Sequence, residues 1–127
     1  MTTMPRGELA IQTLAMPSDT NPQGDIFGGW LVSQMDLAAG ILAKTYSKGR
    51  AATVAIDSMS FLLPVHIGDV VSCYVELEHV GNTSMVINVQ VWKQVFATGE
   101  RSQVTEGVFT FVAINEHGKP RCVKASV

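Results

Sequence analysis

Hydrophobic and polar residues alternate with a period of two over most of the second half of this chain. In residues 70–80 every second residue is apolar: Val71, Cys73, Val75 and Leu77. Residues 85–92 repeat the alternation, and residues 52–63 and 103–114 are rich in β-forming residues. These patterns predict four strands, at 52–63, 70–80, 85–92 and 103–114. Short turn sequences join them, so the expected arrangement is an antiparallel meander.

The first half of the chain predicts one more strand and a single long helix. Residues 8–16 have the composition of a strand, and residues 17–24, PSDTNPQG, are a dense cluster of turn formers. Residues 28–47 form the helix, with Gly49 just beyond its end. The helix is apolar on nearly every side, which indicates a core helix. At roughly 30 Å it matches the strands in length. The predicted fold class is therefore α+β, with the helix along one face of a curved antiparallel sheet.

Size, composition and charge narrow the function classes. The 127 residues predict a single domain spanning residues 1–127. Hydrophobic residues make up 46% and charged residues 16%, which favours a chain that covers part of its surface with copies of itself. The net charge of −2, without a basic stripe, gives no support for nucleic-acid binding. No apolar run approaches the ~20 residues that a membrane span needs.

The location expected from the sequence is the cytoplasm. The N-terminal sequence MTTMPRGEL lacks the apolar segment of a secretory signal. Cys73 and Cys122 are isolated, and neither belongs to a CxxC pair. Reduced thiols are the simplest interpretation.

Asp36 is the unusual residue of the predicted helix. Aspartate is a poor residue in a helix interior because its carboxylate competes for backbone hydrogen bonds. Its neighbours three and four positions away are Val32, Ser33, Ala39 and Gly40, so no charged stripe surrounds it. One interpretation is a solvent-exposed side chain or one bonded to a buried backbone group. The other is a partly desolvated carboxylate in a ligand cleft, acting as general base or nucleophile.

Gly28 and Gly29 lie where the helix begins. The first backbone N–H groups of a helix have no partner within the helix, and its dipole favours negative charge there. Glycine allows a substrate carbonyl to come close to the backbone. A glycine pair is also common before an ordinary helix. Together with Asp36, however, it describes a metal-free site that hydrolyses an acyl compound, with an oxyanion bound at the helix N-terminus.

Other catalytic patterns are missing. There is no GxSxG elbow, P-loop or GxGxxG sequence. His66, His79 and His117 lack metal-ligand spacing, so no metal site is expected. Cys73 lies on the apolar face of its strand, where cysteine packs as a small hydrophobic residue more often than it acts as a nucleophile.

The stretch AMPSDTNPQGDIFGGWLVSQMDLAAG resembles the acyl-CoA thioester hydrolases of the hotdog superfamily, in particular the small bacterial YciA-type branch. TVAIDSMSFLLPVHIGDVVSCY, VGNTSM and EGVFTFVAI extend the likeness over residues 9–114. The resemblance implies a hotdog fold, in which the sheet wraps a long central helix. It also implies homodimers joined edge to edge, with active sites shared at the interface, and a further trimer of dimers.

The resemblance also implies roles for individual residues. Asp36 would be the catalytic carboxylate, and Asn21 of the other protomer would position water or the thioester. The backbone of Gly28 and Gly29 would polarise the thioester carbonyl. The pantetheine arm would follow residues 53–60, which include Thr53, Ser58 and Ser60. The nucleotide would lie near Arg50, Asn82, Ser84 and neighbouring basic groups. No cofactor is implied, because coenzyme A is part of the substrate and of the product.

The same fold is compatible with two other functions. A non-catalytic acyl-CoA binding or sensing protein remains the alternative, although retention of Asn21 and Asp36 favours chemistry. An acyl dehydratase would use a histidine with an acidic partner, and neither the loop nor the helix contains a histidine. The preferred acyl length does not follow from the sequence, since Met35, Met59 and Phe61 fit either an acyl tunnel or the core.

Overall fold

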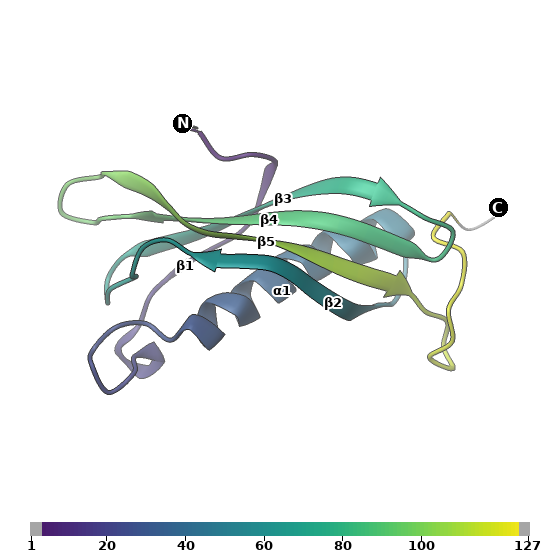
Figure 1. Ribbon diagram of the computed structural model, residues 1–127, viewed down its shortest axis with the longest axis horizontal. Coiled ribbons are helices and arrows are strands. Elements are labelled where there is room, and N and C mark those ends of the chain that lie inside the picture. Colours follow the sequence, from purple (N-terminus) through teal and green to yellow (C-terminus); the bar gives the residue numbers. More distant parts are fainter. Residues whose placement is uncertain (1–3, 125–127) are drawn as a thin grey trace.

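A computed structural model describes residues 4–124, which form one five-stranded sheet and one long helix (Figure 1). The elements in chain order are β1 (Glu8–Leu14), the short 3-10 helix η1 (Pro17–Asp19), α1 (Gly28–Ser47), β2 (Ala51–Phe61), β3 (Val70–Val80), β4 (Ser84–Gln94) and β5 (Arg101–Ala113). The predicted bounds of the helix and of the 70–80 strand are confirmed, and the other strands agree within two residues. Over this range no helix combines the length and the apolar character needed to cross a membrane.

The strand order is β1-β3-β4-β5-β2, and every neighbouring pair is antiparallel. The expected meander is confirmed for β3 to β5 but is wrong for β2, which pairs with β5 instead of β3. The cause is the connection of residues 62–69, which leads from the edge strand β2 across the sheet to β3, the strand next to the opposite edge. Its backbone is tied to other segments on the way: Ile26 donates to the carbonyl of Val65, and Ala15 to that of Asp69, both at 3.0 Å. As a result β1 and β2 are the two sheet edges.

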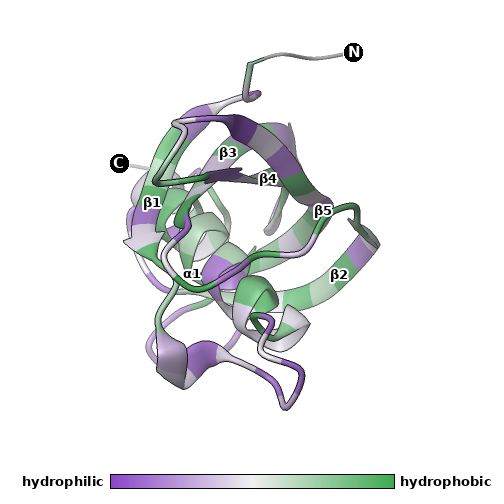
Figure 2. Ribbon diagram, turned by 90° about the vertical axis from the view of Figure 1, so that its left-hand side faces the viewer, coloured by the Kyte–Doolittle hydropathy of each residue, from purple (hydrophilic) through white to green (hydrophobic). Residues whose placement is uncertain are grey.

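The hydrophobic core lies between α1 and the concave face of the sheet, which curves around the helix (Figure 2). The helix turns small residues as well as large ones toward the sheet; those buried are Leu31, Met35, Ala38, Ala39, Gly40, Ala43 and Ser47. Small residues let the helix approach closely. A Cβ added at Gly40 would lie 3.7 Å from the ring of Phe111, an ordinary packing distance.

The expected core helix is confirmed on the side that faces the sheet, but its opposite side is exposed in the single chain. Leu37 and Ile41, on the other side of α1, are 55% and 49% exposed. On the edge strand β2, Val54 and Ile56 are 58% and 43% exposed. An apolar helix face and an apolar, unpaired strand edge are features that proteins usually cover by association.

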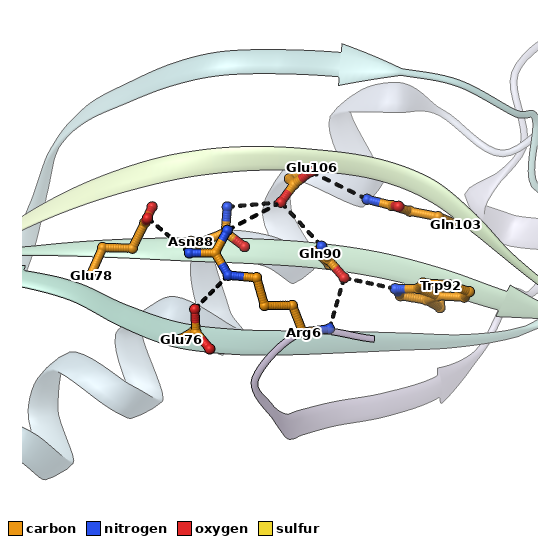
Figure 3. A network of polar contacts seen from close by, with 8 residues as sticks. All are labelled: Arg6, Glu76, Glu78, Asn88, Gln90, Trp92, Gln103 and Glu106. Atoms are coloured by element: carbon orange, nitrogen blue, oxygen red, sulfur yellow. Dashed lines mark hydrogen bonds and ion pairs between the residues drawn. The ribbon is translucent and has the colours of Figure 1, made fainter. Parts of the chain in front are cut away.

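The convex face of the sheet carries a polar network instead (Figure 3). Arg6, from the segment before β1, forms ion pairs with Glu76 and Glu78 and lies 3.9 Å from Glu106. Burial alone would raise the pKa of Glu106. Hydrogen bonds from Gln90, Asn88 and Gln103, together with the charge of Arg6, outweigh it and hold that pKa below its ordinary value. The N-terminal segment is thereby fixed across the face that does not contact α1.

Candidate active site

The loop before α1 is organised by Asn21. Its Oδ1 accepts hydrogen bonds from the backbone N–H groups of Gln23 at 3.0 Å and Asp25 at 3.1 Å. The Asp25 carboxylate in turn lies 3.2 Å from Nδ1 of His66. Since the loop itself uses Oδ1, the amide NH₂ is the part of the Asn21 side chain left to act on a ligand. This loop support by His66 was missed in the sequence, because the two residues are far apart in the chain.

The start of α1 is open. Gly28 is the first helical residue, and Gly29 follows. The first hydrogen bonds of the helix run from the N–H groups of Trp30 and Leu31 to the carbonyl of Phe27. The N–H groups of Gly28 and Gly29 come before these bonds and have no acceptor within the helix. A Cβ at Gly29 would meet nothing within 4 Å. The glycine pair therefore exposes two donors at the positive end of the helix dipole.

Asp36 is half-buried in the middle of α1, where Thr53 of β2 holds it. The Thr53 hydroxyl donates to Oδ1 of Asp36 at 2.5 Å. Among residues 4–124, Oδ2 has no hydrogen-bond partner, so it remains available. The two side chains line a depression of about 220 Å³, together with Leu37, Gly40, Ile41, Lys44, Ala51 and Phe111. Of the two interpretations given above, the structure favours a carboxylate facing a cleft.

Asp36 and the helix N-terminus do not meet within one chain. Eight residues separate Gly28 from Asp36 in a continuous helix. At 1.5 Å per residue this corresponds to about 12 Å along the axis. A single reacting carbonyl has to lie ~3 Å from both the oxyanion donors and the attacking group. One protomer therefore contains both the helix N-terminal donors and the Asp36 carboxylate but does not bring them together.

Ser58 and Ser60 lie further along β2, Ser58 within a bulge and Ser60 directly after it. The pairing with β5 shifts between Asp57 and Ser60, and Ser58 has a left-handed φ of 56°. Both serines border a second depression, of about 290 Å³, beside Glu106. Thr53, near the beginning of β2, belongs to the Asp36 depression instead. The three β2 residues expected to contact substrate are thus divided between two places.

Arg50, Asn82 and Ser84 lie at one end of the sheet, where β2 and β4 begin and β5 ends. Nη1 of Arg50 donates to the carbonyls of Asn115 and Glu116, both at 3.2 Å. Asn82 accepts from the Cys122 thiol through Oδ1 and from the Val123 backbone through its carbonyl. Arg50 and Asn82 therefore hold the C-terminal segment in place.

Lysines at the same end were missed in the sequence. The exposed residues Lys44 and Lys48 lie one helical turn apart at the end of α1. Lys119 and Lys124, also exposed, follow β5. Lysine near a helix C-terminus also complements the helix dipole, so this pair is not distinctive in the sequence. The end of the sheet nevertheless presents several exposed lysines.

Cys73 has no features of a nucleophile, and the histidines of residues 4–124 belong to no metal-binding cluster. Cys73 is fully buried, and burial raises the pKa of its thiol to about 12, which keeps it protonated and unreactive. Between residues 4 and 124, no cluster of three or more His, Cys, Asp or Glu side chains is arranged to hold a metal ion.

Known proteins resemble the chain over nearly its whole length. Residues 23–100 match the thioesterase superfamily. The acyl-CoA thioester hydrolase YciA of Salmonella typhimurium is 52% identical over 127 residues, covering 95% of this chain and 96% of the relative. The hexameric thioesterase y2039 from Yersinia pestis superposes with a TM-score of 0.92 at 50% identity, covering 97% of this chain and all of that one.

A more distant structure bears on individual residues. The acyl-CoA hydrolase from Staphylococcus aureus was solved as an asparagine-to-alanine mutant with coenzyme A and as an aspartate-to-alanine mutant. Each of the two mutant chains is 28% identical to this one, and the TM-scores are 0.84 and 0.82. The matches cover 91% and 90% of this chain and 69% and 70% of the other. The mutated asparagine and aspartate are 15 residues apart in that protein. Asn21 and Asp36 have the same separation here.

Proposed function

The chain belongs to the thioesterase superfamily, has the hotdog fold and is an acyl-CoA thioester hydrolase, and we propose that Asp36 is its catalytic carboxylate. The observation that carries this assignment is the single hydrogen bond from Thr53, which fixes Oδ1 of Asp36 and leaves Oδ2 available beside a depression. The shared separation of asparagine and aspartate in the Staphylococcus aureus hydrolase supports it.

In the proposed reaction, water attacks the thioester carbonyl carbon while Oδ2 of Asp36 accepts a proton from that water. The carbonyl oxygen becomes an oxyanion, and the N–H groups of Gly28 and Gly29 stabilise it with the helix dipole behind them. The carbonyl then re-forms as the carbon–sulfur bond breaks, and the proton held on Asp36 passes to the leaving sulfur. This releases coenzyme A as the thiol together with a carboxylic acid, and it restores the Asp36 carboxylate. The NH₂ group of Asn21 positions the water or the thioester. The step requires no cofactor, since coenzyme A enters as part of the substrate.

We propose that two protomers complete each site. Because about 12 Å of helix separates Gly28 from Asp36, the glycines and Asn21 of one protomer act with Asp36 of the other. The unpaired edge of β2, with Val54 and Ile56 exposed, provides the surface for edge-to-edge pairing. The hexameric relatives support a further association into a trimer of dimers. The two cysteines without a disulfide partner fit a cytoplasmic enzyme.

The nucleotide of coenzyme A is proposed to lie at the basic end of the sheet. Lys44 and Lys48 are two and three helical turns beyond Asp36, which corresponds to about 12 and 18 Å along the axis. An extended pantetheine arm that runs along α1 past Thr53 could bridge this distance between the thioester at Asp36 and the phosphates at the lysines. Arg50, Asn82 and Ser84 shape this end of the molecule. The lysines supply the positive charge that phosphate groups favour.

The first experiment measures free-thiol release from short, medium and long acyl-CoAs by wild type and by Asp36→Asn. Asp36→Asn keeps the size of the side chain and removes only its charge, so it should assemble as wild type does. We expect a loss of turnover of at least 100-fold, the lower end of what general base catalysis contributes. Size-exclusion chromatography and thermal unfolding check that the variant is intact. An assembled Asp36→Asn enzyme with wild-type turnover contradicts the assignment of Asp36, and a wild type that binds acyl-CoA without releasing thiol contradicts the proposed function.

A further inference from the structure

Gly107, in the middle of β5, is not explained by its backbone. It pairs with Val89 in a regular part of the ladder with β4, it lies opposite the bulge of β2 on its other side, and its φ lies outside the left-handed region. Glycine in a strand interior loses side-chain packing and costs conformational entropy, so it often marks a close approach by another group. Here that group is a methionine. A Cβ added at Gly107 would lie 2.9 Å from Cε and 3.0 Å from Sδ of Met59.

Met59 is directed onto Gly107 by the bulge in β2. The pairing of β2 with β5 shifts between Asp57 and Ser60, and Ser58 adopts a left-handed φ of 56°. Bulges commonly redirect a side chain in this way. The buried hydroxyl of Thr105 then contacts the Met59 sulfur at 3.7 Å and donates to the carbonyl of Ser60. Met59 is only half-buried, so its flexible tip contacts the core while one side stays open.

Met59 and Met35 are the next inward-facing residues on β2 and α1 after two residues that line the depression at the helix N-terminus. That depression has a volume of about 310 Å³ and a largely apolar lining, and Gly28, Leu31 and Phe61 are on its border. Met59 is two residues before Phe61 on β2, and Met35 is one turn after Leu31 on α1. The two methionines meet at Gly107, where the added Cβ would also lie 3.5 Å from Cε of Met35. They therefore form the next layer behind the depression.

We infer that the acyl chain of the substrate occupies this depression and that Met59 is the wall that sets its length. The inference rests on the proposed function, because the carbonyl bound at Gly28 would direct its acyl chain past Phe61. Gly107 provides the space in which the Met59 tip rests. Since methionine has several rotatable bonds, this wall can yield to chains of different length. Met59 is thus a specificity-determining residue, and Gly107 acts through it.

The test is the ratio of kcat/KM for acyl-CoAs that differ by two carbons, measured over a series from short to long. Met59→Ala removes three non-hydrogen atoms from the wall, and the space they vacate fits about two methylene groups. We expect the preferred chain to lengthen by about two carbons and the long-to-short ratio to rise about tenfold, as methylene discrimination in apolar pockets allows. Gly107→Ala displaces the Met59 tip toward the depression, so it should shift the preference toward shorter chains.

Met85→Ala is the matched control, since it truncates a fully buried methionine of the same core on β4. It should lower stability while leaving the chain-length profile as in wild type. Thermal unfolding confirms that each variant is folded. If folded Met59→Ala and Gly107→Ala both keep the wild-type profile while turnover persists, the inference is wrong and the proposed function stands. If wild type hydrolyses no acyl-CoA of the series, the proposed function itself is wrong.

Discussion

The carboxylate of Asp36 is held from one side only. Thr53 donates to Oδ1 at 2.5 Å, and the small neighbour Gly40 leaves space beside the carboxylate in the depression that both line. A hydrogen bond to a charged group contributes about 1.5–3 kcal/mol. This interaction orients Oδ2 without neutralising the carboxylate. Thr53 is therefore better described as a positioning residue for Asp36 than as a contact for the pantetheine arm alone.

Thr53→Val tests this role, because valine has the same shape and lacks the hydroxyl. We expect kcat to fall about 10- to 100-fold with KM nearly unchanged, since the loss of one such hydrogen bond corresponds to that range. Thr53→Ser, which keeps the hydroxyl, should recover most of the rate. A residue that only contacted pantetheine would behave differently: Thr53→Val would then raise KM and leave kcat near wild type.

Among individual residues, the sequence identifies candidates whose neighbours along the chain are unusual. Asp36 was found because no charge lies three or four positions away on its helix, and Gly28 and Gly29 because they begin it. The contact between Thr53 and Asp36 could not be predicted from the residues themselves, since it depends on how β2 lies against α1. Gly107 and Met59 were missed as a pair for the same reason.

The helix α1 presents different chemical groups at its two ends. Its N-terminus exposes the N–H groups of Gly28 and Gly29, and its C-terminus bears Lys44 and Lys48. Asp36 lies between them. Periodicity predicted the bounds of α1, but it did not predict that β2 pairs with β5, because alternation shows which face a residue takes and says nothing of the neighbouring strand. The crossover of residues 62–69 decides that pairing.

Reversing the charges at the end of α1 tests where the nucleotide lies. Lys44→Glu together with Lys48→Glu should raise KM for acyl-CoA about tenfold and leave kcat nearly unchanged, since two lost exposed contacts of ~0.7 kcal/mol each amount to a factor of ten. The dependence of KM on ionic strength should also weaken. The control is the pair Lys44→Arg and Lys48→Arg, which keeps both charges and should behave as wild type. An unchanged KM in the reversed variant would place the nucleotide elsewhere.

For the whole molecule, the geometry of one protomer leaves the catalytic groups separated. The helix that carries both Gly28 and Asp36 keeps them about 12 Å apart whatever its neighbours do. Exposed apolar residues on α1 and β2 are in the position that pairing of two β2 edges would cover. The low proportion of charged residues in the sequence predicted self-association in general terms. It could not locate the surface, because that requires knowing that β2 is an edge strand.

Mixed oligomers test whether the site is shared between protomers. Gly28→Pro removes one oxyanion donor at the first helical position, where proline is tolerated, and Phe27 already has the extended backbone, φ −58° and ψ 135°, that precedes proline. Combined with Asn21→Ala it disables one half of the site, and Asp36→Asn disables the other. Each variant alone should be nearly inactive.

When the two inactive chains are co-expressed and assemble at random, each site takes its Asp36 from one protomer and its Asn21 and Gly28 from another. Both contributions are intact in about one quarter of the sites, so activity should return to about 25% of wild type in oligomers of two-fold symmetry. Differently tagged chains allow the mixed species to be purified and assayed for thiol release. If each protomer instead contained its own complete site, every site would carry a defect in one half or the other, and the mixture would remain as inactive as its parents. Recovery therefore separates a site built across the β2 edge from one built within a single chain.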